Sequence, residues 1–139
     1  MEKQITFLHF AVAYGISFVL FLGIDMIWLQ LIAKNFYANK LGELLNPKPS
    51  LVIALIFYVL FPLGIAIFTV LPAFKTGSWS TVLGLSALFG MIAYMTYDIT
   101  NLVTLKGWPV SITLIDIAWG TFVTAATALA TYYLISKIL

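Results

Sequence analysis

Three aspartates, Asp25, Asp98 and Asp116, interrupt stretches of sequence that are otherwise apolar enough to cross a membrane. A carboxyl group in hydrocarbon is costly, so it normally faces a bundle interior or a watery cavity and pairs with a polar partner. Carboxylates gathered in such a place could bind a cation, exchange protons, or hold Mg²⁺, Ca²⁺ or Mn²⁺ through oxygen ligands. No metal motif of defined spacing accompanies them, and we predict no metal site.

The directions of the expected helices place these three aspartates at one depth. The helices carrying Asp25 and Asp98 run from one membrane side, called side A, to the other, side B, and the helix carrying Asp116 returns. Asp25 and Asp98 lie six and five residues before their helices end, and Asp116 lies six residues after its helix begins. At 1.5 Å of rise per residue, each lies ~8–9 Å below the side B boundary.

Other polar and aromatic side chains reach this layer. Tyr58 comes to a similar depth near the start of its helix, and a tyrosine and asparagine face accompanies Asp98 at helical steps of three and four. An aromatic wall beside carboxylates suits a cationic ligand. We therefore predict a ligand-binding pocket made by Asp25, Asp98, Asp116, Tyr58, Tyr94, Tyr97, Asn101 and Trp119.

Each of these residues also has a purely structural interpretation. The aspartates could be packing groups held by tyrosine, threonine or tryptophan donors, and Trp119 could simply fill space. Asp25-Met26-Ile27-Trp28 and Asp116-Ile117-Ala118-Trp119 look alike, but their helices run in opposite directions. Trp28 then points from its aspartate toward the surface and Trp119 toward the centre, so we do not expect a repeated unit. Lys106 could pair with Asp98 or extend to water.

The composition is that of a membrane protein. Of 139 residues, 63% are hydrophobic and 9% charged, whereas a soluble domain carries about 25% charged residues. There is no cysteine, and all seven basic residues are lysines, which excludes thiol chemistry and bidentate arginine clamps. No basic cluster suggests nucleic acid, and no buried lysine or histidine pair identifies a cofactor.

The expected fold is all-α, an integral membrane bundle of four transmembrane helices in a single domain spanning residues 1–139. Each helix has about the 20 apolar residues that a crossing requires, and the first is expected to be retained rather than cleaved. Pro72 is expected to end the second helix and Pro62 to kink it. The expected helices lie at about 5–31, 51–71, 80–103 and 110–136.

The inward faces and the long connection can also be predicted. Residues 32–45 are expected to form a short amphipathic surface helix or a solvated extension of the first helix. The fourth helix should turn a stripe of small and polar residues inward. On the first helix, the face expected to point inward carries Gly15, Phe18, Leu22, Asp25 and Trp28.

The lysines decide orientation by a margin of one residue. Side B carries Lys34, Lys40, Lys48 and Lys106, and side A carries Lys3, Lys75 and Lys137. Because the positive side of a membrane protein faces the cytoplasm, side B is expected to be cytoplasmic.

Several segments resemble one family of small bacterial membrane proteins. They are residues 97–109 and 113–121, together with Asp25-Met26-Ile27-Trp28-Leu29, Phe36-Tyr37 and Leu41-Gly42. The sequence resembles the domain-of-unknown-function family numbered two-one-seven-seven over nearly its whole length. The resemblance implies a multi-pass, four-helix protein of the inner (cytoplasmic) membrane, and it implies no reaction and no catalytic residue.

Three hypotheses of function follow from the residues. The first is binding or transport of a small cationic or proton-coupled solute by a protein that forms a homo-oligomer. The second is a membrane enzyme, or an accessory to one, that acts on lipids near the headgroup level. The third is a structural subunit whose polar layer fixes its assembly in a membrane complex. The expected partners are the lipid bilayer and a small-molecule or lipid ligand, with no nucleic acid.

Overall fold

The fold is an all-helical bundle, seen here in a computed structural model that describes residues 4–139. Four helical stretches are long and apolar enough to cross a membrane, and no strand occurs in the described part of the chain. The four-helix membrane architecture predicted from the sequence is therefore confirmed. The four stretches are Phe7–Ile32, Leu51–Thr76, Trp79–Thr104 and Val110–Ile138.

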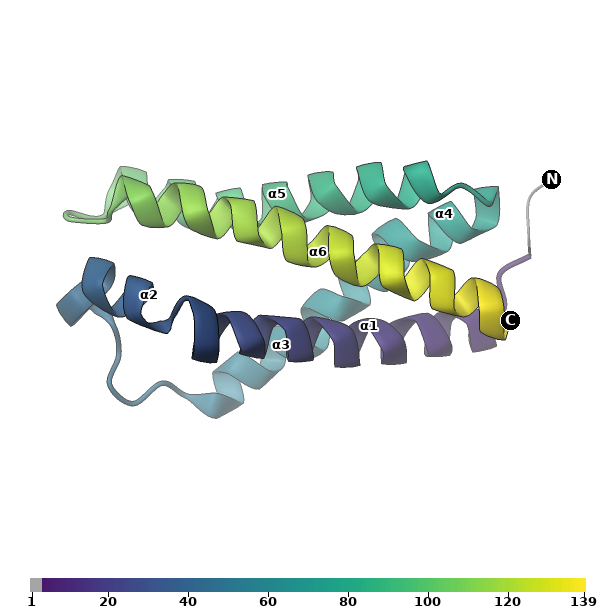
Figure 1. Cartoon of the computed structure of the whole chain (residues 1–139), viewed down its shortest axis with the longest axis horizontal. Coiled ribbons are helices and arrows are strands. Elements are labelled where there is room, and N and C mark those ends of the chain that lie inside the picture. The colour runs from purple at the N-terminus through teal and green to yellow at the C-terminus, as the bar shows by residue number, and fades with distance from the viewer. Residues whose placement is uncertain (1–3) are drawn as a thin grey trace.

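Figure 1 shows how the helices are arranged. Two of the four long stretches contain a π-helical turn. The first stretch is α1 (Phe7–Ile27) followed by a π turn, and the second joins α3 to α4 through another. Between them lie the short helix α2 and a 3₁₀ turn, and the last two stretches are single helices. The remaining bounds are Trp28–Ile32 and Ala66–Val70 for the π turns, Lys34–Leu41 for α2, Gly42–Leu44 for the 3₁₀ turn, Leu51–Ile65 for α3, Leu71–Thr76 for α4, Trp79–Thr104 for α5 and Val110–Ile138 for α6.

Local side-chain chemistry explains where the helices begin. Thr6 and His9 form a reciprocal capping box at the start of α1, in which His9 Nδ1 accepts from the Thr6 backbone N–H at 3.1 Å. Ser50 and Ser78 accept backbone N–H groups at the starts of α3 and α5. The single histidine is thus engaged at side A, far along α1 from Asp25.

The end of the second transmembrane stretch differs from the prediction. The helix does not stop at Pro72 but continues to Thr76, and Gly77 with φ +75° ends it. Pro72 lies in the first turn of α4, directly after the π turn. Proline is tolerated at such a position even though it has no backbone N–H to donate. Pro62 lies within α3, and π-helical geometry begins at Ala66.

The segment after α1 forms a separate short helix, the first of the two alternatives predicted for residues 32–45. α2 ends at Gly42, whose φ of +52° is a conformation that glycine adopts without strain. α2 does not extend α1 but turns toward the N-terminal end of α6 (Figure 1).

The bundle is held together most extensively by α5 and α6. A Cβ atom on Gly90 would lie 2.5 Å from the Gly120 carbonyl oxygen and 2.6 Å from Thr124 Cβ, so these backbones approach as closely as glycine permits. The small and polar stripe predicted on α6 is buried at Gly120, Thr124, Thr127 and Thr131.

The buried face of α1 differs in part from the expected one. Ala13, Ser17, Phe21 and Asp25 are buried at steps of four residues, whereas Gly15 is exposed. A step of four follows one ridge of the helix, and that ridge contains Asp25 but not Gly15.

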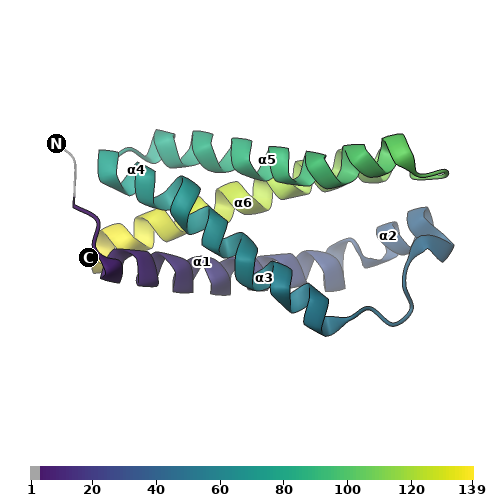
Figure 2. The ribbon, with the colours of Figure 1, turned by 180° about the vertical axis from the view of Figure 1, so that it is seen from behind.

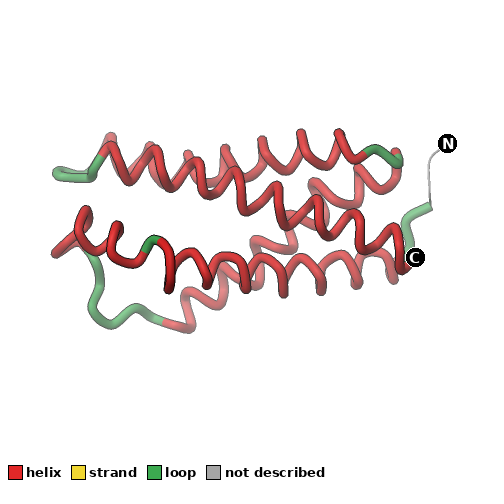
Figure 3. The backbone as a smooth tube through the Cα atoms, in the orientation of Figure 1, coloured by secondary structure: helices red, strands yellow, loops and turns green. Residues whose placement is uncertain are grey.

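The bundle is closed toward side A and divergent toward side B. α4 and the turn Ala66–Val70 pack on α5, whereas α3 separates from α5 toward its own N-terminus (Figure 2). The connections before α3 and between α5 and α6 lie at the same end, side B (Figure 3). The C-terminus lies at the opposite end, side A, where Lys3, one of the lysines counted there, falls outside the described residues.

Candidate functional site

Asp25 is a fully satisfied carboxyl at the junction of three helices. It is 5% exposed, and it accepts hydrogen bonds from the Tyr58 hydroxyl on α3 and from Trp119 Nε1 on α6, the latter at 2.8 Å. Each oxygen therefore has a donor. Three of the predicted site residues are thus brought together, in an arrangement that ties α1 to its neighbours.

Asp116 is held by a residue that the sequence did not place in the site. The Tyr37 hydroxyl on α2 donates to Asp116 Oδ1 at 2.8 Å and accepts from Trp28 Nε1 at 3.2 Å. Burial, with the Asp116 carboxylate as a second cause, raises the pKa of the Tyr37 phenol above its ordinary value, so it remains a donor at neutral pH. In the sequence, Tyr37 is only an aromatic residue in a short segment with lysines, and that pattern does not indicate Asp116 as its acceptor.

The two Asp-x-x-Trp segments are paired across the bundle, a contact that the sequence did not predict. Because α1 and α6 are antiparallel, Trp119 bonds to Asp25, and Trp28 reaches Asp116 through Tyr37. The two indoles stack with centroids 4.3 Å apart at 6°. The opposite helix directions that argued against a repeat are what allow the segments to dock.

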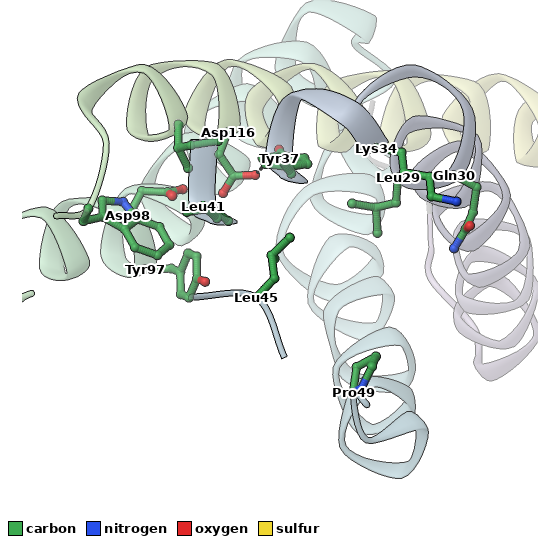
Figure 4. A pocket seen from close by; sticks show the side chains of 12 residues that line it. Leu29, Gln30, Lys34, Tyr37, Leu41, Leu45, Pro49, Tyr97, Asp98 and Asp116 are labelled. Atoms are coloured by element: carbon green, nitrogen blue, oxygen red, sulfur yellow. Dashed lines mark hydrogen bonds between the residues drawn. The ribbon is translucent and has the colours of Figure 1, made fainter. Parts of the chain in front are cut away.

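This pairing also changes the predicted single depth of the carboxyls. Trp119 lies three residues, ~4.5 Å, deeper along α6 than Asp116. Asp25 is bonded to Trp119 at that deeper level, whereas Asp98 lies beside Asp116 (Figure 4). The acidic residues thus form an inner single carboxyl and an outer pair.

Asp98 is the unsatisfied member of the outer pair. It is 0% exposed, and neither carboxyl oxygen has a hydrogen-bond partner in residues 4–139. Its side chain points toward Asp116 at the wall of a cavity (Figure 4). Lys106, which was considered as a partner, is exposed and gives Asp98 no hydrogen bond. A buried carboxylate without a donor carries a large desolvation cost, so Asp98 is the carboxyl that would gain most from a hydrogen-bond donor.

Two cavities adjoin the outer pair. The first, of about 490 Å³, is lined by both carboxyls of the pair and by residues of α2 and its flanking segments, Gln30 and Lys34 among them. The second, of about 560 Å³, is lined mainly by aromatic and apolar side chains of α3 and α5. Leu29, Tyr97 and Asp116 line both, so the cavities adjoin one another at Asp116.

The remaining predicted residues are divided between cavity walls and packing. Tyr97 is 57% exposed and lines both cavities, and Tyr94 lines the second with its ring against the Gly120 backbone. Four predicted residues line neither cavity. Residues 4–139 contain no group of three or more His, Asp or Glu side chains placed to hold a metal ion. The four residues outside both cavities are Asp25, Tyr58, Asn101 and Trp119.

Replacing Tyr37 with phenylalanine is expected to loosen α2. The change removes the hydrogen bond to Asp116, which contributes about 1 kcal/mol. Backbone amides of α2 should then exchange with deuterium about fivefold faster. Hydrogen–deuterium exchange with mass spectrometry measures this, with Tyr133→Phe, an exposed tyrosine on α6, as the control. Equal exchange in Tyr37→Phe and the unmodified protein would show that this bond does not hold α2.

Comparison with known proteins agrees with this architecture. No curated protein and no solved structure matches the chain. A family model described as "Predicted membrane protein (DUF2177)" matches residues 10–133, which include all four long helices in large part and every residue of the outer pair and its cavities. This chain, a membrane protein with four candidate transmembrane helices, therefore belongs to the DUF2177 family.

Proposed function

We propose that this protein binds a small cationic solute, or a solute that carries a proton, at Asp98 and Asp116. The observation that supports the proposal is the pair of Asp98 oxygens, buried at the cavity wall without a donor. Intramembrane ionisable groups of this kind commonly mark the paths of substrates, ions or protons. The family resemblance leads us to place the protein in the bacterial inner membrane.

An ammonium group has the chemistry that the outer pair lacks. It carries three N–H donors and a positive charge, and charge-assisted hydrogen bonds are the strongest that a carboxylate accepts. Asp116 already receives one donor, from Tyr37, and Asp98 receives none from the described residues. A ligand held between them would satisfy Asp98 and offset the repulsion between the two acids. Lys34, also at the wall of the first cavity, would disfavour a second cation.

A single chain in this one conformation does not offer the ligand a path across the membrane. Toward side A the bundle is packed with buried apolar side chains, such as Phe74, Val82 and Ile135. Four helices leave little room for a continuous path. We therefore propose that transport, as distinct from binding, takes place in a homo-oligomer.

Replacing Asp98 with asparagine is expected to weaken binding of n-butylammonium at least tenfold. Removing one member of a buried charge pair changes binding by about 2 kcal/mol or more, and 1.4 kcal/mol is tenfold. Tryptophan fluorescence of the protein in lipid nanodiscs reports the affinity, because Trp108 lines the cavity. Glu43→Gln is the matched control, since it removes an exposed carboxylate outside both cavities.

The result that contradicts the proposal is equally specific. If Asp98→Asn and Glu43→Gln bind n-butylammonium with the affinity of the unmodified protein, the outer pair is not a cation site. Native mass spectrometry of the same preparations would then show whether any retained molecule depends on Asp98.

A further inference from the structure

We infer that the ligand is a lipophilic primary amine, with its ammonium between Asp98 and Asp116 and its alkyl chain in the second cavity. The inference rests on the proposed function and adds the class of molecule to it. It also gives the route: the amine reaches the site sideways from the bilayer, between α3 and α5.

The second cavity has the character of a site for an alkyl chain. Its wall is formed by Phe57 and Phe61 of α3 and by Ala93 and Tyr94 of α5, and its volume of about 560 Å³ lies in the usual range for small-molecule sites. Asp116 is the only acidic or basic residue in its lining. A cavity so apolar, with its carboxyl shared with the first cavity, suits a molecule with one charged end.

The charged end should be a primary amine because of what Asp98 lacks. Its two oxygens are without donors, so a head that brings N–H groups relieves the desolvation cost in full. A quaternary ammonium brings the same charge without any donor and would leave both acceptors unpaired. A carboxylic acid or an alcohol brings no positive charge to the pair.

Lateral access follows from the divergence of α3 from α5. Toward side B, α3 has few neighbours, and Leu51, Val52 and Ile53 are 80%, 72% and 69% exposed. Figure 2 shows this end of α3 separated from α5, on the side where the second cavity lies. A cavity lined by side chains of both α3 and α5 gives an amphiphile a lateral route on which its alkyl chain stays among apolar groups. The acidic head end favours an amine over a second copy of the chain.

The test distinguishes the contribution of the ligand's alkyl chain to binding from that of its ammonium group. Affinities of dodecylamine, n-butylamine and dodecyltrimethylammonium are measured by tryptophan fluorescence in lipid nanodiscs. The variants are Ala93→Phe, which fills the second cavity, and Ala118→Phe, which adds the same side chain at an exposed position of α6. Partition of each probe into lipid is the same for every variant, so only ratios between variants are compared.

The expected result is a selective loss. Ala93→Phe should weaken dodecylamine at least tenfold and leave n-butylamine within twofold, which also shows that the variant is folded. Ala118→Phe should change neither probe. For each probe, the ratio of its affinity for the unmodified protein to its affinity for Asp98→Asn measures the dependence on Asp98. This ratio for dodecyltrimethylammonium should be less than a tenth of the ratio for dodecylamine.

Three outcomes would overturn the inference. Unchanged dodecylamine binding in Ala93→Phe would show that the chain lies elsewhere, while the proposed function would stand if Asp98→Asn still weakened n-butylamine. Equal losses for both amines would show that the cavity has no specific role for the chain. A change from oligomer to monomer in native mass spectrometry of Ala93→Phe would show that a second copy covers the groove.

Discussion

Replacing Gly90 with leucine is expected to destabilise the bundle by about 3 kcal/mol or more. Even a Cβ at this position would lie 2.5 Å from the Gly120 carbonyl oxygen and from Thr124 Oγ1. Two of the nearest atoms belong to the facing backbone and to a Cβ, so no flexible side chain can move aside. Overpacking typically costs about 1–3 kcal/mol, and separating the most extensive helix pair of the fold exceeds the usual case. Unfolding in mixed detergent micelles, followed by circular dichroism, measures the loss.

Gly84→Leu provides a control on the same helix. A Cβ at Gly84 would meet nothing within 4 Å, and the residue is exposed. The substitution should stabilise α5 by up to about 1 kcal/mol, because glycine is a poor helix former. The two variants should therefore differ in sign. Equal effects would mean that α5 and α6 do not meet through Gly90.

Replacing Asp25 with leucine is expected to destabilise the protein by about 2 kcal/mol. The volume is similar, but the Tyr58 hydroxyl and Trp119 Nε1 lose their common acceptor. A hydrogen bond to a charged group contributes about 1.5–3 kcal/mol in water-soluble proteins. Interhelical bonds in membranes average about 0.6 kcal/mol because the unfolded state also finds partners. The two lost hydrogen bonds and the two donors left unpaired together account for a destabilisation of about 2 kcal/mol. The same micellar unfolding experiment measures it.

Replacing Asp98 is expected to affect stability differently from replacing Asp25. Asp98→Asn removes a buried carboxylate that accepts no hydrogen bond, so it should leave stability unchanged or raise it while weakening ligand binding. Asp25→Leu should lower stability through lost pairing. If both substitutions reduced stability alike, the carboxyls would not differ in role, and the division into an inner structural acid and an outer ligand-binding pair would fail.

Local patterns predicted the elements and all of their ends but one. The helices begin within about two residues of the expected positions because apolar stretches, capping serines and Pro109 are local signals. The second helix was expected to end at Pro72, since a proline normally stops a helix. Instead, a π turn precedes Pro72 and the helix continues to Thr76, and such turns have no simple sequence signal.

The candidate site shows the same division. Its acidic residues could be identified from their cost in hydrocarbon, and Tyr58 from its depth. The role of Tyr37 could not be predicted, because a residue in a connecting segment reaches Asp116 only after α2 has turned back onto α6. The contact between the two Asp-x-x-Trp segments was not predicted, because it depends on the rotation of each helix about its axis as well as on helix direction.

By itself, the sequence determined that this is a four-helix membrane protein with an acidic layer near one face. Hydropathy, length and periodicity are properties of each helix alone. The tertiary structure decided which acids are satisfied and which are not. Asp25 has two donors because α3 and α6 pack where Tyr58 and Trp119 reach it, whereas in residues 4–139 no donor reaches Asp98 on α5. That arrangement is a property of the interfaces between helices and is not contained in any one of them.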